Sequence, residues 1–203
     1  MILLENIKRI AEKATGWRRP EDTQALLRER KPQTYRFTDD GVIPNHPTWP
    51  LILYKSAVRL PKCLDPAAVF EELFESRGWG SSWRDGIYDF VHYHSRIHEV
   101  LGVARGSGQV RFGGKNGRAV TLKAGDVAIL PAGTGHQRIK ASDDFLVVGA
   151  YPASGAYDEC KSQQDREKAL PAIDRVARPR QDPVFGKDGP LMHIWLPRSR
   201  RRS

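Results

Sequence analysis

The chain has 203 residues, of which 39% are hydrophobic and 28% charged, and its formal net charge at pH 7 is +9. This composition is ordinary for a soluble globular protein with enough apolar residues for a core. It excludes a membrane-spanning helix, because no run of about 18 apolar residues occurs, and the first residues lack the layout of a signal peptide. We therefore expect a cytoplasmic protein whose two cysteines, Cys63 and Cys160, are reduced thiols.

Basic charge is concentrated at the C-terminus. Arg198, Arg200, Arg201 and Arg202 supply four of the positive charges. We interpret residues 197–203 as a solvated, disordered tail, because a short run of like charges is usually flexible. Nucleic-acid binding by this tail is the less favoured alternative, because no aromatic residues alternate with the arginines.

Residues 1–33 are predicted to form a helical appendage ahead of a single domain that spans residues 34–196. Residues 5–31 have helical character, with a break at residues 16–20. A second helix is predicted to begin at Pro20, because proline and acidic residues occupy its first turn and arginine its last.

A strand, a helix and a loop are predicted next. The strand covers residues 51–60, and residues 65–77 have the apolar spacing of a helix. Asp65 is its candidate N-cap, Pro66 suits its first position, and Gly78 is a plausible stop. The loop covers residues 79–85, where Trp79 and Trp83 either cover a pocket or pack in the core.

Short strands with regular turns dominate the rest of the chain. They are predicted at residues 109–112, 119–122, 127–130, 136–139 and 145–151. Such a series is typical of an all-β barrel or sandwich. A helical pair interrupted at Pro171 is predicted over residues 163–176, and a closing strand over residues 191–195.

Three histidines and one glutamate are candidate metal ligands. His92 and His94 lie two residues apart in a β-rich run, so their side chains share one face. Glu99 begins the next apolar run, which could return antiparallel and face them, and His136 follows a tight turn. Three imidazoles and one carboxylate suit one divalent Fe, Mn, Ni, Co or Zn ion, and the donors alone do not choose among these metals.

The same residues carry a family resemblance. The chain resembles the cupin superfamily, whose two sequence signatures match here at Gly86, His92, His94, Glu99 and Gly106, and at Gly125, Pro131, Gly133 and His136. Lys140 replaces the asparagine that usually ends the second signature. Residues 39–45, 94–102, 147–152 and 182–186 further resemble the YjlB-like cupins. The resemblance implies an all-β double-stranded β-helix, or jelly-roll barrel, with flanking N- and C-terminal helices, a metal site and a homodimer.

Further residues are candidates for the pocket. His98 is excluded as a ligand, because alternation places it on the opposite face from Glu99. Tyr88, Phe90, Gln109 and Arg111 are candidate substrate-binding residues, and an inward Arg111 would favour an anionic substrate. No general base is identifiable, so we predict no catalytic residue.

Two function hypotheses remain open. In the first, a metal-dependent enzyme acts on a small organic molecule. Oxygenase chemistry leads, because histidine-plus-carboxylate sites with open positions suit Fe(II), and isomerisation or decarboxylation with Mn or Ni follows. In the second, the protein binds or senses a small ligand without catalysis, and the metal anchors the ligand or stiffens the barrel. The lack of an identifiable base weakens the enzyme hypothesis, and a turnover assay separates the two.

Overall fold

The fold is described from a computed structural model, in which residues 23–60 and 65–196 are placed. The helix predicted before residue 16, Cys63 and the basic tail of residues 197–203 lie outside these residues. Within the described ranges, no helix is long and apolar enough to cross a membrane.

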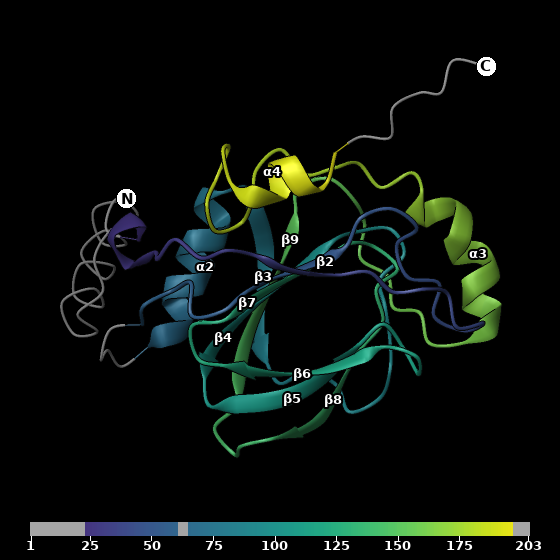
Figure 1. The fold of residues 1–203 in the computed structure, drawn as a ribbon, viewed down its shortest axis with the longest axis horizontal. Coiled ribbons are helices and arrows are strands. Elements are labelled where there is room, and N and C mark those ends of the chain that lie inside the picture. Colours follow the sequence, from purple (N-terminus) through teal and green to yellow (C-terminus); the bar gives the residue numbers. More distant parts are fainter. Residues whose placement is uncertain (1–22, 61–64, 197–203) are drawn as a thin grey trace, which may run out of the picture.

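The strands form two sheets, one of six strands and one of three (Figure 1). The larger sheet has the order β1-β2-β7-β4-β9-β3, with β1 (Gln33–Tyr35), β2 (Leu51–Tyr54), β7 (Val127–Leu130), β4 (Glu99–Arg105), β9 (Leu146–Pro152) and β3 (Trp79–Asp85). The smaller sheet has the order β6-β5-β8, with β6 (Arg118–Lys123), β5 (Ser107–Phe112) and β8 (His136–Ala141). All neighbouring strands are antiparallel. This architecture confirms the predicted all-β jelly roll.

Side chains alternate between the two faces of the larger sheet. Leu101 on β4 packs in a core cluster with Phe112 of the smaller sheet, so it points between the sheets. Val100 belongs to a second cluster, together with the helix that covers the outer face. Because successive strand residues point to opposite sides, Glu99 shares the inner side with Leu101, whereas His98 lies on the outer side.

Helix α2 (Pro66–Ser76) covers the outer face of the larger sheet (Figure 1). Its buried residues have the spacing that predicted it: Val69, Phe70, Leu73 and Phe74. Gly78 follows the helix with a φ of 75°, which glycine adopts without strain. Asp65 makes no capping hydrogen bond, because its carboxylate binds Arg84 on β3 instead.

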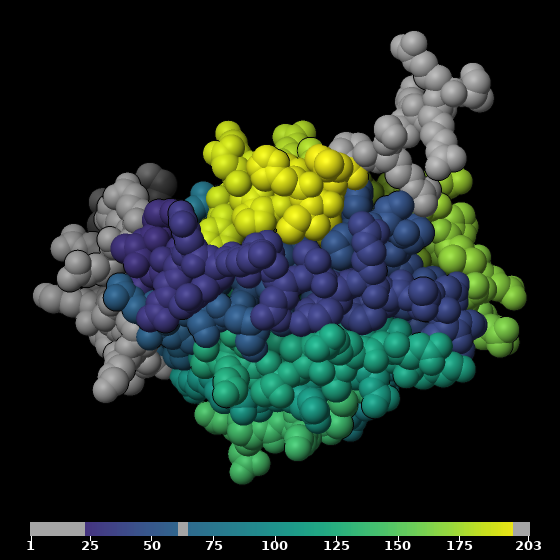
Figure 2. All heavy atoms as spheres, in the orientation of Figure 1, coloured from purple at the N-terminus to yellow at the C-terminus, as the bar shows by residue number. Residues whose placement is uncertain are grey.

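Two helices follow the last strand and lie at separate places on the barrel (Figures 1 and 2). Helix α3 (Gln163–Ile173) begins with a capping box between Ser162 and Asp165 and continues through Pro171, so the predicted interruption is wrong. It ends two residues after this proline, which therefore disturbs only the last turn. Helix α4 (Pro190–Ile194) occupies the predicted closing strand, because Pro190 starts a helical turn and the Leu191 N–H donates to Asp182.

Two further predictions were also wrong. The predicted loop at residues 79–85 is the edge strand β3, which pairs with β9 around a bulge between Gly80 and Trp83. The helix predicted from Pro20 onwards forms, in its described part, only a 3-10 turn, η2 (Gln24–Leu26). Leu27 then bridges Val58, so backbone pairing replaces the helix.

Candidate metal centre

Backbone pairing positions the three histidines. His92 and His136 form an isolated antiparallel bridge with N···O distances of 3.2 and 2.9 Å, and Tyr93 pairs with Cys160 in the same way. This stretch is therefore extended, although it is not the continuous strand that was predicted. Tyr93 packs in a separate core cluster, while His92 and His94 line one cavity.

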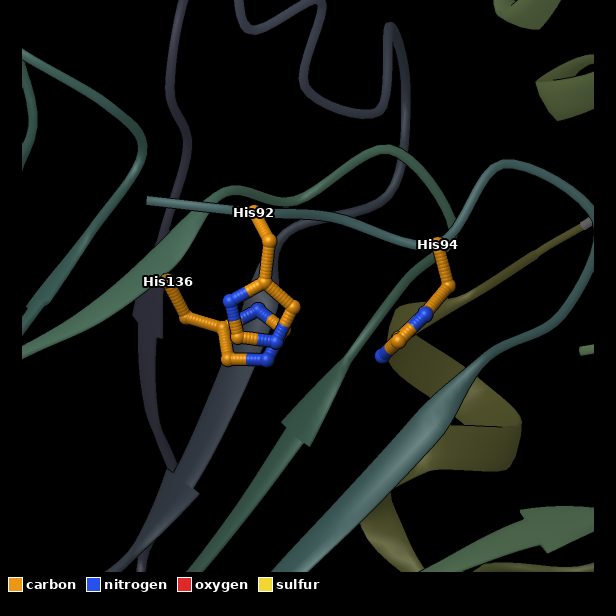
Figure 3. A group of neighbouring side chains, drawn as sticks. All are labelled: His92, His94 and His136. Atoms are coloured by element: carbon orange, nitrogen blue, oxygen red, sulfur yellow. The ribbon is translucent and has the colours of Figure 1, made fainter. Parts of the chain in front are cut away.

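The three imidazoles converge on a common space (Figure 3). The ring nitrogens of His92, His94 and His136 that could hold a metal lie within 4.8 Å of one another, and all three residues are buried. Glu99 is buried beside them, with Oε2 lying 3.4 Å from His94 Nε2 and 3.2 Å from His136 Nε2. The structure thus brings the three predicted histidines together and places Glu99 against two of them.

Each histidine of this triad directs its Nδ1 at a backbone carbonyl. The distances are 3.4 Å from His92 to the Phe90 oxygen, 2.5 Å from His94 to the Asp158 oxygen, and 3.2 Å from His136 to the Thr134 oxygen. A carbonyl oxygen only accepts, so Nδ1 carries the proton and Nε2 of each neutral ring carries a lone pair. Metal-binding histidines are usually fixed in this way by a partner of the other nitrogen.

Glu99 supplies the negative charge of the cluster. Its Oε2 is buried and has no hydrogen-bond partner among the described residues. The approaches of His94 and His136 are not hydrogen bonds in the neutral tautomers, because lone pairs meet the carboxylate. Such a group of acceptors is stable only with a cation, either a proton or a metal ion. The donor set therefore fits a metal.

The pKa values of His94 and Glu99 show the same attraction for positive charge. Burial alone would lower the pKa of His94, but the charge of Glu99, together with hydrogen bonds to Glu99 and to the Asp158 backbone, outweighs it and raises the pKa to about 9. Burial would raise the pKa of Glu99, and the two neighbouring histidines instead lower it. For His92, burial, together with the charges of His136 and His94, lowers the pKa to about 3. A proton and a metal ion would therefore compete for this cluster.

Asp158 holds the segment around His94. Its backbone oxygen faces the His94 ring, and its carboxylate accepts hydrogen bonds from the Ser95 N–H (2.8 Å), the Ser95 hydroxyl (2.5 Å) and the Arg96 N–H (3.2 Å). Nearby Cys160 is a free, buried thiol whose pKa is raised by burial to about 11. Asp158 could not be predicted from the sequence, because no motif links it to a histidine 64 residues away.

A cavity of about 460 Å³ adjoins the triad and Glu99. A volume of this order is typical of small-molecule sites. Four aromatic side chains contribute to its walls: Trp83, Tyr88, Tyr151 and Tyr157. The Trp83 indole N–H donates to the Tyr151 hydroxyl at 2.9 Å. Burial, followed by the charge of Glu99, raises the pKa of Tyr151, so this phenol stays protonated.

The four predicted substrate-binding residues lie in different places. Tyr88 lines the cavity, whereas Phe90 stacks on Tyr88 with 4.7 Å between ring centroids and is not part of the wall. Gln109 and Arg111 are also absent from the wall, and Arg111 is exposed. On β5, Gly108, Val110 and Phe112 are buried, so alternation turns Gln109 and Arg111 outward. We do not retain Gln109 and Arg111 as ligand-binding residues.

Comparison with known proteins identifies the family. A cupin profile matches residues 87–180, a range that contains all four predicted metal ligands. The uncharacterised protein YjlB of Bacillus subtilis (strain 168) is 41% identical over 169 residues, which are 83% of this chain and 99% of YjlB. The chain belongs to the YjlB-like cupins. Membership of this family explains the two-sheet barrel and the paired signatures.

Solved structures resemble this cupin only in part. Acireductone dioxygenase from Bacillus anthracis is 23% identical, with 43% of this chain and 62% of that chain covered and a TM-score of 0.31. A variant of oxalate decarboxylase from Bacillus subtilis is 18% identical, covers 56% of this chain and 28% of that chain, and has a TM-score of 0.34. A Klebsiella pneumoniae protein with a double-stranded β-helix domain is 14% identical, with coverages of 70% and 88% and a TM-score of 0.33. Similarity at this level carries no information about the reaction.

Proposed function

We propose that this YjlB-like cupin binds one divalent transition metal through His92, His94, His136 and Glu99, and acts on a small organic molecule in the adjoining cavity. The observation that supports this most is the orphaned Glu99 oxygen beside imidazoles whose Nδ1 atoms all face backbone carbonyls. Glu99 Oε2 and the ring nitrogens of the three histidines gather in one buried space, which makes a metal ion a natural partner.

The donor set suits Fe, Mn, Ni, Co or Zn, and four protein ligands leave coordination positions for a substrate. When bound, such an ion can polarise a substrate oxygen as a Lewis acid and, in the case of Fe(II), support dioxygenase-type chemistry, which we propose first. Isomerisation or decarboxylation with Mn or Ni comes second.

The residues around the ligands would position the substrate and supply protons. Burial raises the pKa of Tyr157 to about 12, so its hydroxyl stays protonated. It donates a long hydrogen bond to Glu159 at 3.4 Å, which a substrate oxygen would replace. Tyr151 already accepts from Trp83, which leaves its own proton for Glu99 or for a bound ligand.

A non-catalytic ligand-binding or sensor role is the alternative, and one observation favours it. The phenols at the cavity, Tyr151 and Tyr157, have raised pKa values and act as proton donors, not bases. Glu99 belongs to the metal cluster. The iron- and manganese-loaded proteins should be offered a panel of enols, keto acids and thiols. Tight binding of one compound without turnover of any would support the sensor role.

The metal itself is tested by elemental analysis of protein purified without added metal. We expect about one transition-metal ion per chain, and almost none in His94→Ala, because the remaining donors no longer surround the ion. His193→Ala, which removes an exposed histidine on α4, is the matched control and should keep the wild-type content. Equal metal content in wild type and His94→Ala would refute the proposed centre.

A further inference from the structure

Exposed aromatic side chains gather at the opening of the metal-site cavity. In the part of the chain that the structure describes, seven large hydrophobic side chains are exposed, and Tyr88, Phe90 and Tyr157 are three of them. The Tyr88 ring lies 5.1 Å from the His92 ring, and the Tyr157 ring lies 4.9 Å from the His94 ring. Each of these tyrosines thus contacts a different candidate metal ligand while about half of its surface faces solvent.

The segment that carries Tyr88 is fixed by its backbone. The Arg138 N–H donates to the Tyr88 oxygen at 2.8 Å, and the Arg138 side chain donates to the Ile87 oxygen at 2.9 Å. The Gln137 side-chain amide donates a hydrogen bond to the Asp89 backbone oxygen at 2.7 Å. Phe90 stacks on one face of the Tyr88 ring, and the Lys161 ammonium lies 4.4 Å from the Phe90 centroid. Tyr88 is therefore an exposed ring on a preorganised support, which lowers the entropy cost of binding a ligand.

The cavity offers no free cation to an anionic ligand. Arg84 is the one arginine or lysine among the described residues that line it. Its guanidinium is already bound to Glu71, at 2.6 and 2.5 Å, and to Asp65, at 3.0 and 2.9 Å. Asp85 and Glu99 add negative charge to the same wall. A small dicarboxylate would find only the metal as a positive partner, and it would fill little of the 460 Å³.

Because of these features, we infer that the cavity selects a planar aromatic or conjugated molecule that binds the metal through an oxygen chelating group, and that Tyr88 and Tyr157 determine this specificity by contacting its ring. This inference rests on the metal centre proposed above and names the substrate class of that site. Aromatic rings pair favourably in stacked and edge-to-face arrangements, and both tyrosines present ring surface beside the metal ligands.

Two chelators separate ring recognition from metal binding. 4-Nitrocatechol carries an aromatic ring and an oxygen pair, whereas acetohydroxamate carries an oxygen pair without a ring. Both are titrated by calorimetry into protein reconstituted with Mn(II), and the manganese content of every variant is measured. We expect Tyr88→Ala and Tyr157→Ala each to weaken 4-nitrocatechol about 10-fold, and acetohydroxamate by less than about 2-fold.

Conservative and distant variants complete the test. Tyr88→Phe keeps the ring and should restore 4-nitrocatechol affinity. Leu170→Ala removes an exposed apolar side chain that is not part of this wall, and should change neither chelator. Equal weakening of both chelators, or no weakening of 4-nitrocatechol, would overturn the inference while leaving the metal centre intact. Protein that retains no manganese and binds neither chelator would instead refute the metal centre, and the inference with it.

Discussion

Buried histidines in this protein have two different roles, one represented by His98 and the other by the triad of His92, His94 and His136. His98 is fully buried, with Nε2 donating to the Ala177 oxygen at 3.2 Å and Nδ1 accepting from the Ala132 N–H at 2.9 Å. Both of its nitrogens are therefore used by the backbone. In the triad of His92, His94 and His136, only Nδ1 meets a carbonyl, and Nε2 is left for the space beside Glu99.

This difference shows that burial does not identify a metal ligand. His98 precedes Glu99, but strand alternation turns it outward, where it packs 4.9 Å from the Trp195 ring and 5.6 Å from the Trp49 ring. A buried histidine whose two nitrogens are both satisfied supports the structure, whereas one with an unused nitrogen beside a carboxylate can bind a cation.

The largest effect that separates the two sets is expected for His98→Ala. It leaves the Ala132 N–H and the Ala177 carbonyl without partners and opens a cavity beside the tryptophans, so the free energy of unfolding should fall by about 3 kcal/mol. Urea denaturation of the metal-free protein measures this loss. Metal content per folded chain should stay at the wild-type value, opposite to the expectation for His94→Ala. Loss of metal at unchanged stability would show that we have assigned the two sets wrongly.

Acid should destabilise the protein through His98. Burial and, to a lesser extent, the charge of His46 lower the pKa of His98 to about 3. Below about pH 6.5, the His98 imidazole is therefore protonated in the unfolded chain and neutral in the folded chain. The free energy of unfolding falls with decreasing pH, by up to about 1.4 kcal/mol per pH unit. His94 has the opposite sign, because its pKa is raised to about 9, and its contribution is lost as pH rises through that value.

The pH effect is measured by urea denaturation of the metal-free protein between about pH 4 and pH 6. Other groups titrate in this range, so the informative quantity is the difference in slope between wild type and His98→Ala. The variant should have the shallower slope. Identical slopes would mean that His98 is protonated in the folded protein or that its environment is more polar than the buried contacts indicate.

The grouping of the candidate metal ligands could be predicted from sequence because their spacing is encoded locally. His92 and His94 share a face through their spacing, and the turn before His136 fixes where that residue begins β8. The helix α2 was equally clear, since Pro66, the apolar spacing and Gly78 all agree. Local signals of this kind need no knowledge of what packs against them.

The rest of the cavity depends on pairings between distant segments. Trp83 lines the wall because β3 pairs with β9, whereas the Gly-Ser-Ser run at residues 80–82 favoured a loop instead. Asp158 reaches His94 across a loop, and Tyr151 meets Trp83 across the sheet. On β5, no sequence feature distinguished the outward Gln109 and Arg111 from inward residues before the buried partners were known.

The smallest expected effect on binding concerns that wall. It is tested by alanine substitutions at two glycines on neighbouring strands. Gly149 on β9 lies opposite Trp83 in the strand register, and an added Cβ would come within 2.1 Å of the indole ring. Gly102 on β4 faces the other side, where a Cβ would lie 2.4 Å from the Phe70 ring on α2. Each alanine substitution overpacks one face of the same sheet and should cost about 1–3 kcal/mol of stability.

The two substitutions should differ at the cavity. Gly149→Ala displaces Trp83 and breaks its hydrogen bond to Tyr151, so it should change the tryptophan fluorescence and weaken 4-nitrocatechol, while the triad keeps its metal. Gly102→Ala should destabilise the protein to a similar degree and leave chelator affinity unchanged, because it disturbs only the outer layer. If both variants alter chelator binding equally, strain passes through the sheet and the inner wall is not an independent recognition surface. If neither variant alters chelator binding, Trp83 is a structural residue of the barrel, and Tyr88 and Tyr157 at the opening recognise the ligand.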